Sequence, residues 1–167
     1  MSELAYLSLG SNVGDRAAQL REAVRRLGSL GPVRSVSSIY ETEPVEFTAQ
    51  PWFLNCVVAL ETSSTPAQLM QQLLAIEKAM GRERIQKQGP RAIDLDIVLM
   101  GSEVVHTPDL TIPHPAMEKR RFVLQPLAEI APEARHPLSG KSVRELLEGL
   151  SPGQLVRPWS ESHPNND

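Results

Sequence analysis

The chain has 167 residues, a formal net charge of −3 and a single cysteine, which suits one domain with its own hydrophobic core. The charge argues against a general nucleic-acid-binding protein, because the basic residues cluster locally and do not cover a whole face. The start of the chain does not have the pattern of a signal peptide, and its apolar runs are too short to span a membrane, so we expect a cytoplasmic protein that binds neither nucleic acid nor membrane.

The first part of the chain predicts two strands with a helix between them. Residues 5–9 form a short apolar strand that ends at Gly10. Residues 15–27 form a helix that ends at Gly28, and residues 33–41 form the second strand. The apolar side chains that recur at helical spacing in this helix are Leu20, Ala23, Val24 and Leu27.

The middle of the chain predicts a loop, a third strand and a second helix, in that order. Residues 43–51 contain two prolines and predict an irregular loop, and residues 53–61 predict a third strand. Residues 65–80 form a second helix, because Thr65 and Gln68 have the spacing of a capping box. Cys56 lies within the apolar pattern of the third strand, which favours a buried thiol in a reducing compartment over a nucleophile.

The last part of the chain predicts a fourth strand and smaller elements. Residues 93–100 are rich in aliphatic side chains and form the strand. Val104 and Val105 add a short strand, and residues 116–130 hold helical segments broken near Pro126. A short helix over 142–150 is capped by Ser142 and Glu145, which again have the spacing of a capping box.

The resulting order of elements is βαββαβ, the order of the ferredoxin-like α+β sandwich, followed by a C-terminal α/β appendage. We expect residues 1–159 to form a single domain and residues 160–167 to form a polar, disordered tail. This topology supports many unrelated functions, so the function must be argued from particular side chains. Two helices cover one face of such a sheet, which leaves the other face for ligands.

Two carboxylates near the start of the fourth strand are the most informative feature. Asp94 and Asp96 are two positions apart, so their side chains point to the same face and their Cα atoms lie about 6.6 Å apart. The residues between and beside them, Ile93, Leu95, Ile97 and Leu99, form an apolar face that must be buried. Two acids on a rigid strand suit Mg²⁺ and phosphates, although solvated acids at a strand entry are the alternative for an isolated pair.

Basic residues precede the two acids. Arg82, Arg84 and Lys87 lie in a segment bounded by Gly81 and the Gly-Pro pair at 89–90, and Arg91 follows that pair. Guanidinium groups match phosphate oxygens in a bidentate geometry. The segment has no apolar periodicity, so it predicts a mobile loop that closes over phosphates, or a solvated basic loop if it acts alone.

The chain resembles the 6-hydroxymethyl-7,8-dihydropterin pyrophosphokinase family of folate biosynthesis. The resemblance is nearly end to end, and its most specific part is Gly-Pro-Arg-Ala-Ile-Asp-Leu-Asp at 89–96 followed by Pro113-His114. The other matching segments cover residues 6–12, 38–44, 50–55 and 110–114. The resemblance implies an ATP-dependent diphosphotransferase that moves the diphosphate of ATP onto the hydroxymethyl group of a reduced pterin and releases AMP.

The same resemblance implies a role for particular residues. It assigns two Mg²⁺ ions to Asp94 and Asp96, and it makes these acids, with Arg82 and Arg91, the catalytic set. The pterin ring is expected between Phe53 and Phe122, with Asn55 at its amide-like edge. The remaining implied pterin-binding residues are Gly10, Thr42, Glu43 and Val45.

The resemblance also implies a nucleotide half of the site, formed by residues from several segments, and partners limited to ATP and the pterin, with a monomeric protein. Lys87 and Gln88 stand where many family members carry Arg followed by an aromatic residue. The implied ATP-binding residues are Glu77, Arg82, Arg84, Lys87, Arg91, Ile97, Thr111, His114 and Arg120.

Two other classes share the predicted order of elements. A small RNA-binding module would need stacked aromatic side chains and a basic surface on its central strands, where this chain has acids. A ligand-sensing regulatory domain would have no use for paired strand carboxylates beside arginines. The fate of ATP in the presence of Mg²⁺ and the reduced pterin separates both from the enzyme.

Overall fold

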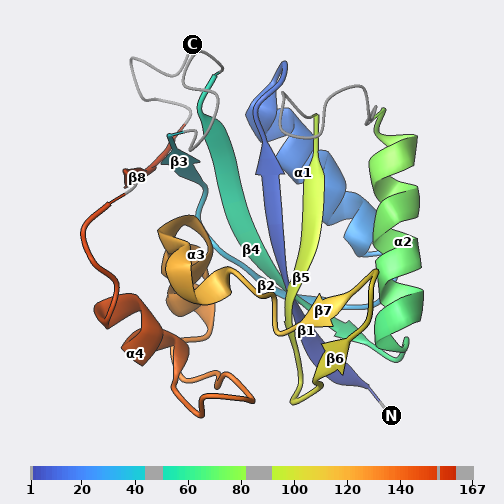
Figure 1. Cartoon of the computed structure of the whole chain (residues 1–167). Helices are drawn as coiled ribbons and strands as arrows, with labels where there is room; N and C mark the ends of the chain where they lie inside the picture. Colours follow the sequence, from blue (N-terminus) through green and yellow to red (C-terminus); the bar gives the residue numbers. More distant parts are fainter. Residues whose placement is uncertain (1, 44–50, 82–91, 154, 161–167) are drawn as a thin grey trace.

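The computed structural model describes residues 2–43, 51–81, 92–153 and 155–160. A six-stranded sheet with antiparallel pairing runs through the molecule, and helices cover both of its faces (Figure 1). The protein is therefore a mixed α/β structure with an antiparallel sheet. The expectation that one face of the sheet is free of helices is wrong, because α3 (Arg121–Ile130) and α4 (Val143–Glu148) pack on that face. No helix among the described residues combines the length and the apolar character that crossing a membrane requires.

The sheet has the strand order β5-β1-β4-β3-β8, and β2 also pairs with β4. A separate two-stranded sheet pairs β6 with β7. The strands are β1 (Glu3–Ser11), β2 (Val33–Val36), β3 (Tyr40–Thr42), β4 (Phe53–Thr62), β5 (Asp94–Met100), β6 (Val105–His106), β7 (Thr111–Ile112) and β8 (Val156–Pro158).

The helices begin where the sequence places caps. Thr65 and Gln68 form a complete capping box at the start of α2, and Ser142 and Glu145 form another at the start of α4. The side chain of Asp15 accepts a hydrogen bond from the Ala18 backbone N–H at the start of α1. The helices are α1 (Arg16–Leu27), α2 (Pro66–Ala79), α3 (Arg121–Ile130) and α4 (Val143–Glu148), and the 3-10 helix η1 (Met117–Lys119) precedes α3.

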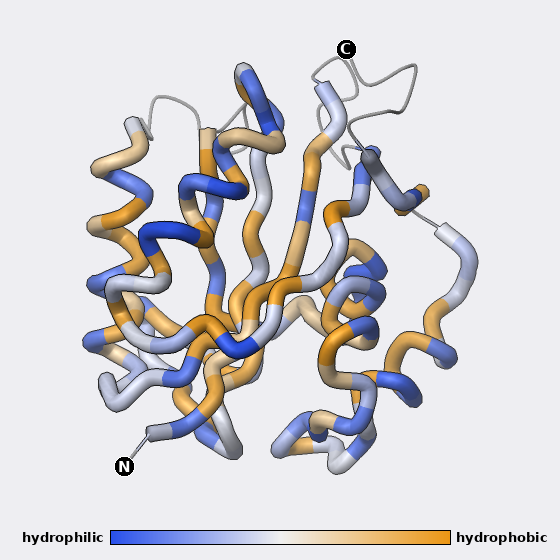
Figure 2. Tube along the Cα trace, turned by 180° about the vertical axis from the view of Figure 1, so that it is seen from behind, coloured by the Kyte–Doolittle hydropathy of each residue, from blue (hydrophilic) through white to orange (hydrophobic). Residues whose placement is uncertain are grey.

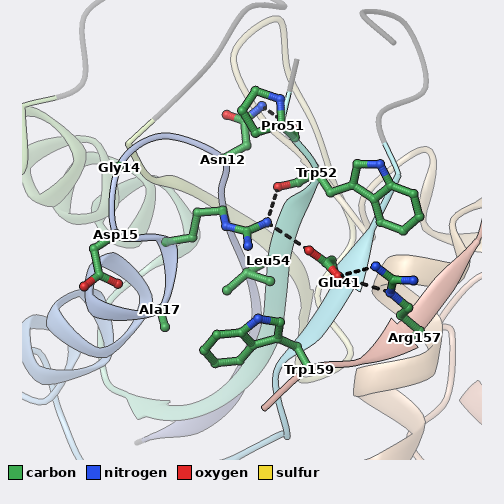
Figure 3. A pocket seen from close by; sticks show the side chains of 11 residues that line it. Asn12, Gly14, Asp15, Ala17, Glu41, Pro51, Trp52, Leu54, Arg157 and Trp159 are labelled. Carbon is green, nitrogen blue, oxygen red and sulfur yellow. Dashed lines mark hydrogen bonds and ion pairs between the residues drawn. The ribbon is translucent and has the colours of Figure 1, made fainter. Parts of the chain in front are cut away.

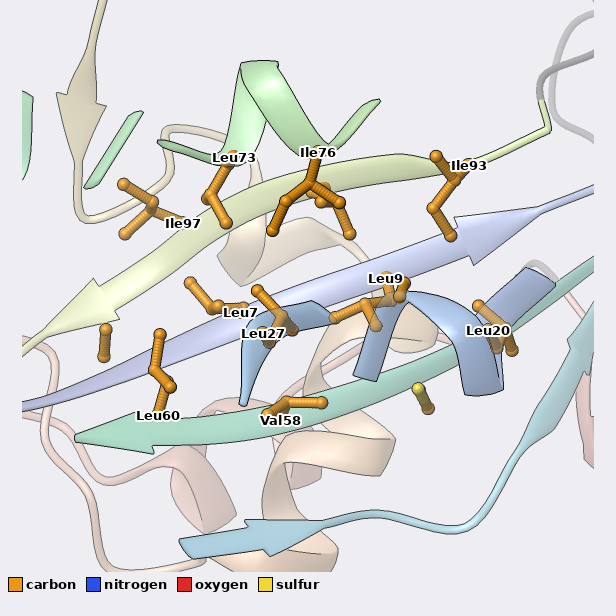
Figure 4. Close-up of a cluster of buried hydrophobic side chains, with 14 of the residues drawn as sticks. Leu7, Leu9, Leu20, Leu27, Val58, Leu60, Leu73, Ile76, Ile93 and Ile97 are labelled. Atoms are coloured by element: carbon orange, nitrogen blue, oxygen red, sulfur yellow. The ribbon is translucent and has the colours of Figure 1, made fainter. Parts of the chain in front are cut away.

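Each face of the sheet carries its own buried cluster. On one face, Leu7 and Leu9 of β1 pack with Leu20 of α1 and with Leu73 and Ile76 of α2 (Figure 4). On the other face, the apolar sides of α3 and α4 pack on β4 and β5. Figure 2 shows hydrophilic and hydrophobic residues alternating along the helices, as expected when each helix buries one side.

The single strand expected over residues 33–41 is wrong, because the structure has two strands there. Between β2 and β3, the Ser37 backbone N–H donates to the Val57 carbonyl and the Val57 N–H donates to the Ser37 hydroxyl, both at 2.9 Å. The hydroxyl of Ser37 thus replaces a backbone carbonyl in the ladder. The next N–H, of Ser38, donates to the Glu129 carboxylate, so strand pairing resumes only at Tyr40.

The helix break expected near Pro126 is also wrong. Pro126 lies inside the continuous helix α3 and is buried together with Val123, Leu124 and Leu127. Proline lacks the N–H that would extend the ladder, which normally weakens a helix interior. Here the burial of that apolar side against the sheet keeps the helix in place.

The apolar face of the fourth strand differs from the expected alternation at its end. Leu95 and Ile97 pack beneath α1 and α2, but Leu99 belongs to the cluster under α3 and α4. The register between β5 and β1 shifts by one residue at this point, so that Val98 is the extra residue of a β-bulge. The bulge turns Leu99 to the face of Asp94 and Asp96, and therefore closes that face at its far end.

The buried thiol expected from the sequence is confirmed, because Cys56 is 2% exposed within the first cluster. Burial raises the pKa of the Cys56 thiol to about 12. Since the thiolate is the reactive form, we expect a thiol reagent at pH 8 to modify the native protein far more slowly than the urea-unfolded chain. Equal rates in the two states would contradict the burial.

Candidate functional site

One row of residues across the sheet brings the separate sequence motifs together. Asp94 of β5 lies opposite Gly10 of β1, which lies opposite Asn55 of β4, which in turn lies opposite Tyr40 of β3. Directly opposed residues in an antiparallel sheet point to the same face. The strand register therefore places an expected metal ligand and two expected pterin contacts side by side, on the face that α3 covers.

The neighbouring positions extend this row into a polar strip. Asp96 lies opposite Ser8, and Phe53 lies opposite Thr42. Asp94, Asp96 and Phe53 are partly buried, whereas Thr42 is 2% exposed. The strip consists of Ser8, Gly10, Thr42, Phe53, Asn55, Asp94 and Asp96, and we refer to it as the polar strip.

Gly10 lies at the centre of the polar strip, where a side chain would force Asn55 to move. A Cβ atom at this position would lie 2.9 Å from Asn55 Nδ2 and 3.5 Å from a ring carbon of Phe53. The first distance is shorter than real Cβ contacts allow. The glycine thus lets the amide of Asn55 and the ring of Phe53 lie close to the backbone of β1.

Two polar atoms of the polar strip are buried without a hydrogen-bond partner among the described residues. They are Oδ1 of Asn55 and Oγ1 of Thr42. Buried polar groups in folded proteins nearly always have a partner, since an unpaired one costs about 1–3 kcal/mol. An unpaired carbonyl and hydroxyl beside a partly exposed aromatic ring are the features expected where a polar, flat ligand binds.

His114 and Arg120 approach the same end of the strip. The His114 backbone N–H donates to the carbonyl of Val98 at 2.9 Å, which fixes the residue beside β5. Burial, and then the charge of Arg120, lower the pKa of His114, while the charge of Asp94 acts in the opposite direction. His114 Nδ1 accepts from the Ala116 N–H at 3.1 Å. We therefore assign the ring as neutral, with its proton on Nε2.

Phe122 stands at the start of α3, next to a cation. The Arg120 guanidinium lies 5.5 Å from the centre of the Phe122 ring. This distance is within the range of a cation–π contact. Arg120, which is expected on the nucleotide side, thus contacts Phe122, which is expected on the pterin side. The two halves of the predicted site are therefore adjacent.

Three further residues expected on the nucleotide side lie around β5. Glu77 of α2 is 3% exposed, and its carboxylate accepts a hydrogen bond of 2.7 Å from the backbone N–H of Leu95. Leu95 is the residue between the two aspartates of β5. Ile97 is 5% exposed, and its side chain is part of the first core cluster (Figure 4). Thr111 lies in β7, which packs against β5.

Glu43 is the last residue of the described range 2–43. Its N–H donates to the Leu155 carbonyl, and its carboxylate accepts from the Leu155 N–H at 2.7 Å. These contacts link the end of β3 to the segment before β8. The remaining site predictions, on Val45, Arg82, Arg84, Lys87 and Arg91, lie outside the described residues, as does most of the predicted tail.

Sequence reasoning missed a cavity of about 570 Å³ on the opposite face of the sheet (Figure 3). At its wall the Glu41 carboxylate bonds to Arg16 at 3.2 Å and to Arg157 at 2.8 Å. Arg16 also donates to the Trp52 carbonyl at 2.7 Å, and the Arg157 guanidinium lies 4.6 Å from the centre of the Trp52 ring. Because side chains alternate along a strand, Glu41 points to the face opposite that of Tyr40 and Thr42. This alternation is the sequence signal that could have placed Glu41 on the cavity side of the sheet.

The donor set at Asp94 and Asp96 fits Mg²⁺. Among the described residues there is no group of three or more His, Cys, Asp or Glu side chains that could hold a metal ion. Mg²⁺ typically takes one or two protein carboxylates and completes its octahedral shell with water and substrate phosphates. Two partly buried carboxylates on one strand are therefore enough when a phosphate ligand shares the ion.

Fold and site together define a mixed α/β protein in which one face of an antiparallel sheet carries the polar strip. The same fold occurs in solved HPPK-DHPS structures. One described as in complex with substrates has a TM-score of 0.70 and 18% identity, covering 89% of this chain and 43% of that one. The wild-type Plasmodium falciparum HPPK-DHPS structure with pteroate has a TM-score of 0.72 and 17% identity, covering 89% and 42%.

The chain belongs to the 7,8-dihydro-6-hydroxymethylpterin-pyrophosphokinase (HPPK) family, whose model matches residues 6–132. It is 47% identical over 163 residues to the 2-amino-4-hydroxy-6-hydroxymethyldihydropteridine pyrophosphokinase of Bacillus subtilis, covering 96% of this chain and 93% of the relative. It is 42% identical over 161 residues to the folic acid synthesis protein fol1 of Schizosaccharomyces pombe, covering 95% of this chain and 22% of that protein. The chain thus spans about a fifth of the length of this fungal relative.

Proposed function

We propose that the protein transfers the diphosphate of ATP to the hydroxymethyl group of 6-hydroxymethyl-7,8-dihydropterin and releases AMP, a step of folate biosynthesis. The observation that carries the proposal is the row that sets Asp94 beside Gly10 and Asn55. It joins a carboxylate pair suited to metal-bound phosphates to an amide suited to a heteroaromatic ring. The names of the bacterial relatives support the same reaction.

For the phosphate side, Asp94 and Asp96 are proposed to hold two Mg²⁺ ions shared with ATP. Such ions neutralise phosphate charge and favour the ionised form of the attacking hydroxyl. The strand fixes both carboxylates, so little reorganisation is needed when ATP binds. On sequence grounds alone we assign Arg82, Arg84, Lys87 and Arg91 to the triphosphate, with Arg82 and Arg91 as catalytic residues that stabilise the charge of the transition state.

For the nucleotide side, we propose that His114 and Arg120 contact ATP. Neutral His114 offers its Nε2–H as a donor, and Arg120 offers positive charge. The charges of Arg120 and Asp94 both act on the pKa of His114, in opposite directions. Thr111 belongs to the same side, as does Glu77, whose carboxylate supports β5 between the two aspartates. The side chain of Ile97 is buried in the core, so we propose that Ile97 contacts ATP through its backbone.

For the pterin side, we propose that the ring lies between Phe53 and Phe122 and that Asn55 pairs with its amide-like edge. The unpaired Oδ1 of Asn55 and Oγ1 of Thr42 supply acceptors at that edge. Gly10 leaves the space, and Glu43 and Val45 contribute backbone groups from the end of β3 and the segment after it. Aromatic faces hold the ring so that its hydroxymethyl oxygen points along the strip toward the phosphate side.

The finer points of organisation are part of the same proposal. The strand order β5-β1-β4-β2 with antiparallel pairing supports a ferredoxin-like sandwich, to which α3, α4 and β8 are added. We propose that residues 1–159 act as one domain, that 160–167 form a polar tail, and that the protein works as a cytoplasmic monomer on small-molecule substrates.

The products of ATP provide the direct test. The protein is incubated with ATP, Mg²⁺ and 6-hydroxymethyl-7,8-dihydropterin, and the nucleotides are separated by chromatography. We expect AMP in equal amount to the pterin diphosphate, and formation of AMP that depends on the pterin. Production of ADP, or AMP that appears without the pterin, would rule out diphosphate transfer.

The two halves of the site can be separated by binding measurements. We expect Phe53→Ala and Phe122→Ala each to weaken pterin binding by about 1–3 kcal/mol, the scale of stacking on an aromatic side chain. Asn55→Ala should also weaken it, because polar pterin edges would then be unpaired in a buried pocket. Calorimetry with a non-hydrolysable ATP analogue should show nearly unchanged nucleotide affinity.

Two outcomes of this experiment would contradict the assignment. Equal losses for both ligands would mean that the phenylalanines serve the core, and no loss for either would remove them from the pterin site. Val36→Ala is a suitable control, because this apolar side chain is exposed in β2 and is not part of the polar strip.

A further inference from the structure

One carboxylate at the end of α3 joins this helix to the sheet. Glu129 accepts hydrogen bonds from the Ser38 backbone N–H at 3.1 and 3.0 Å, from the Ser38 hydroxyl at 2.9 Å and from the Tyr40 hydroxyl at 2.7 Å. The donors lie about ninety positions earlier in the chain, at the junction of β2 and β3. We call this group of Glu129, Ser38 and Tyr40 the α3 anchor.

The α3 anchor and Phe122 lie on the same side of the helix. Phe122 and Glu129 are seven residues apart, and seven steps of about 100° return to nearly the same direction. Phe122 is in the first turn of α3 and Glu129 is in the last. α3 packs on the face of the sheet that carries the polar strip. Fixing Glu129 at one end of the helix therefore restricts the position of Phe122 at the other end.

Tyr40 connects the α3 anchor directly to the strip. Its position lies opposite Asn55 in the register of β3 and β4, and the residue is 8% exposed. The same side chain therefore neighbours an expected pterin contact and donates to Glu129. Among the described residues this is a direct side-chain link between α3 and β3.

The charge state of the α3 anchor is stable across the physiological range. Burial acts to raise the pKa of Glu129, but hydrogen bonds from Tyr40 and Ser38 outweigh it and lower that pKa from its usual value. Burial, together with the hydrogen bond and charge of Glu129, raises the pKa of Tyr40 to about 12. The proton thus stays on the tyrosine, and the carboxylate remains an acceptor for all four bonds.

We propose that Glu129 is a positioning residue for the pterin site: by holding the last turn of α3 on Ser38 and Tyr40, it sets the separation between Phe122 and Phe53. This role rests on the proposed function, since it is the pterin ring that would occupy the gap. Glu129 itself touches neither substrate. Its removal frees the helix to shift, so the ring loses one of its two stacking surfaces.

The test compares ligand affinities of Glu129 variants. We expect Glu129→Ala to raise the Kd for the pterin about tenfold, as for a weakened stacking contact. The Kd for a non-hydrolysable ATP analogue and the turnover at saturating pterin should change less than twofold. Tyr40→Phe should act in the same direction but more weakly, because the bonds from Ser38 remain. The double variant should add little to Glu129→Ala, which already removes the acceptor of the Tyr40 hydroxyl. Glu129→Gln should recover part of the affinity through its amide oxygen.

A matched control separates positioning from general loss of stability. Ser142→Ala removes the cap of α4, which lies beside α3, and lowers stability without touching the α3 anchor. We expect its pterin Kd to equal that of the wild type. If Ser142→Ala weakens pterin binding as much as Glu129→Ala, or if Glu129→Ala weakens both ligands equally, Glu129 has only a structural role.

A ligand-free measurement distinguishes failure of this inference from failure of the proposed function. Amide hydrogen exchange should be faster across α3 in Glu129→Ala and unchanged in β5, and unchanged protection of α3 would overturn the anchoring itself. A wild-type protein that forms no AMP and binds no pterin would overturn the proposed function and, with it, the positioning role, even where the exchange of α3 responds as expected.

Discussion

Replacing Asp94 or Asp96 by alanine is expected to lower turnover by at least about a hundredfold while the protein stays folded. A single charge-stabilising group removed from an active site typically costs that much. Both side chains are partly exposed on the strip face of β5 and lie outside the two core clusters, so the free energy of unfolding should change little. The measurement is the rate of AMP formation with Mg²⁺ as the only divalent ion, alongside a urea unfolding curve.

The control for this experiment is another carboxylate of the same type. Asp109 is exposed between β6 and β7 and is not part of the polar strip, and Asp109→Ala should retain wild-type turnover. Wild-type rates in either strip variant would exclude the proposed metal site. A large loss of stability in those variants would instead mean that the two acids serve the fold.

Replacing Glu41 by alanine is expected to destabilise the protein by about 3–5 kcal/mol, because it leaves a buried cation without its counter-charge. The side chains of Glu41 and Arg16 are 8% and 13% exposed, and the Glu41 carboxylate bonds to both Arg16 and Arg157. Arg157→Ala should cost less, since its side chain is 43% exposed. Urea unfolding of each variant gives the free energies directly.

An exposed ion pair provides the comparison for Glu41. Arg34 and Glu61 form a pair whose side chains are 57% and 31% exposed, and Arg34→Ala should cost about 0–1 kcal/mol. A loss below 1 kcal/mol in Glu41→Ala would show that water replaces the carboxylate. In that case the cavity at Arg16 is open to solvent in the folded protein.

Local signals in the sequence were enough to place most helices and strands. The capping boxes at Thr65 and Ser142 depend only on residues three positions apart, and both are present in the structure. The break between β2 and β3 could not be predicted from such local signals. It depends on Ser37 bonding to Val57 and on Ser38 bonding to Glu129, and both partners come from distant parts of the chain.

The candidate site shows the same division between local and distant information. Strand alternation predicted that Asp94 and Asp96 share a face, but only the register shows that Gly10 lies between Asp94 and Asn55. The sequence did not predict β8, which is three residues long and contains a proline, so it lacks the pattern of a strand. Because β8 was not predicted, the contact between Glu41 and Arg157 could not be predicted either.

The carboxylate of Glu77 also affects how copies of this protein behave together. β5 is the outermost strand on its side of the sheet, and such a strand exposes backbone groups to which another chain can add. The buried carboxylate of Glu77 accepts a hydrogen bond from the Leu95 N–H and so occupies one of those groups. At the opposite edge, Pro158 of β8 has no N–H to offer. β5 and β8 thus each offer one backbone N–H fewer to a strand of another copy.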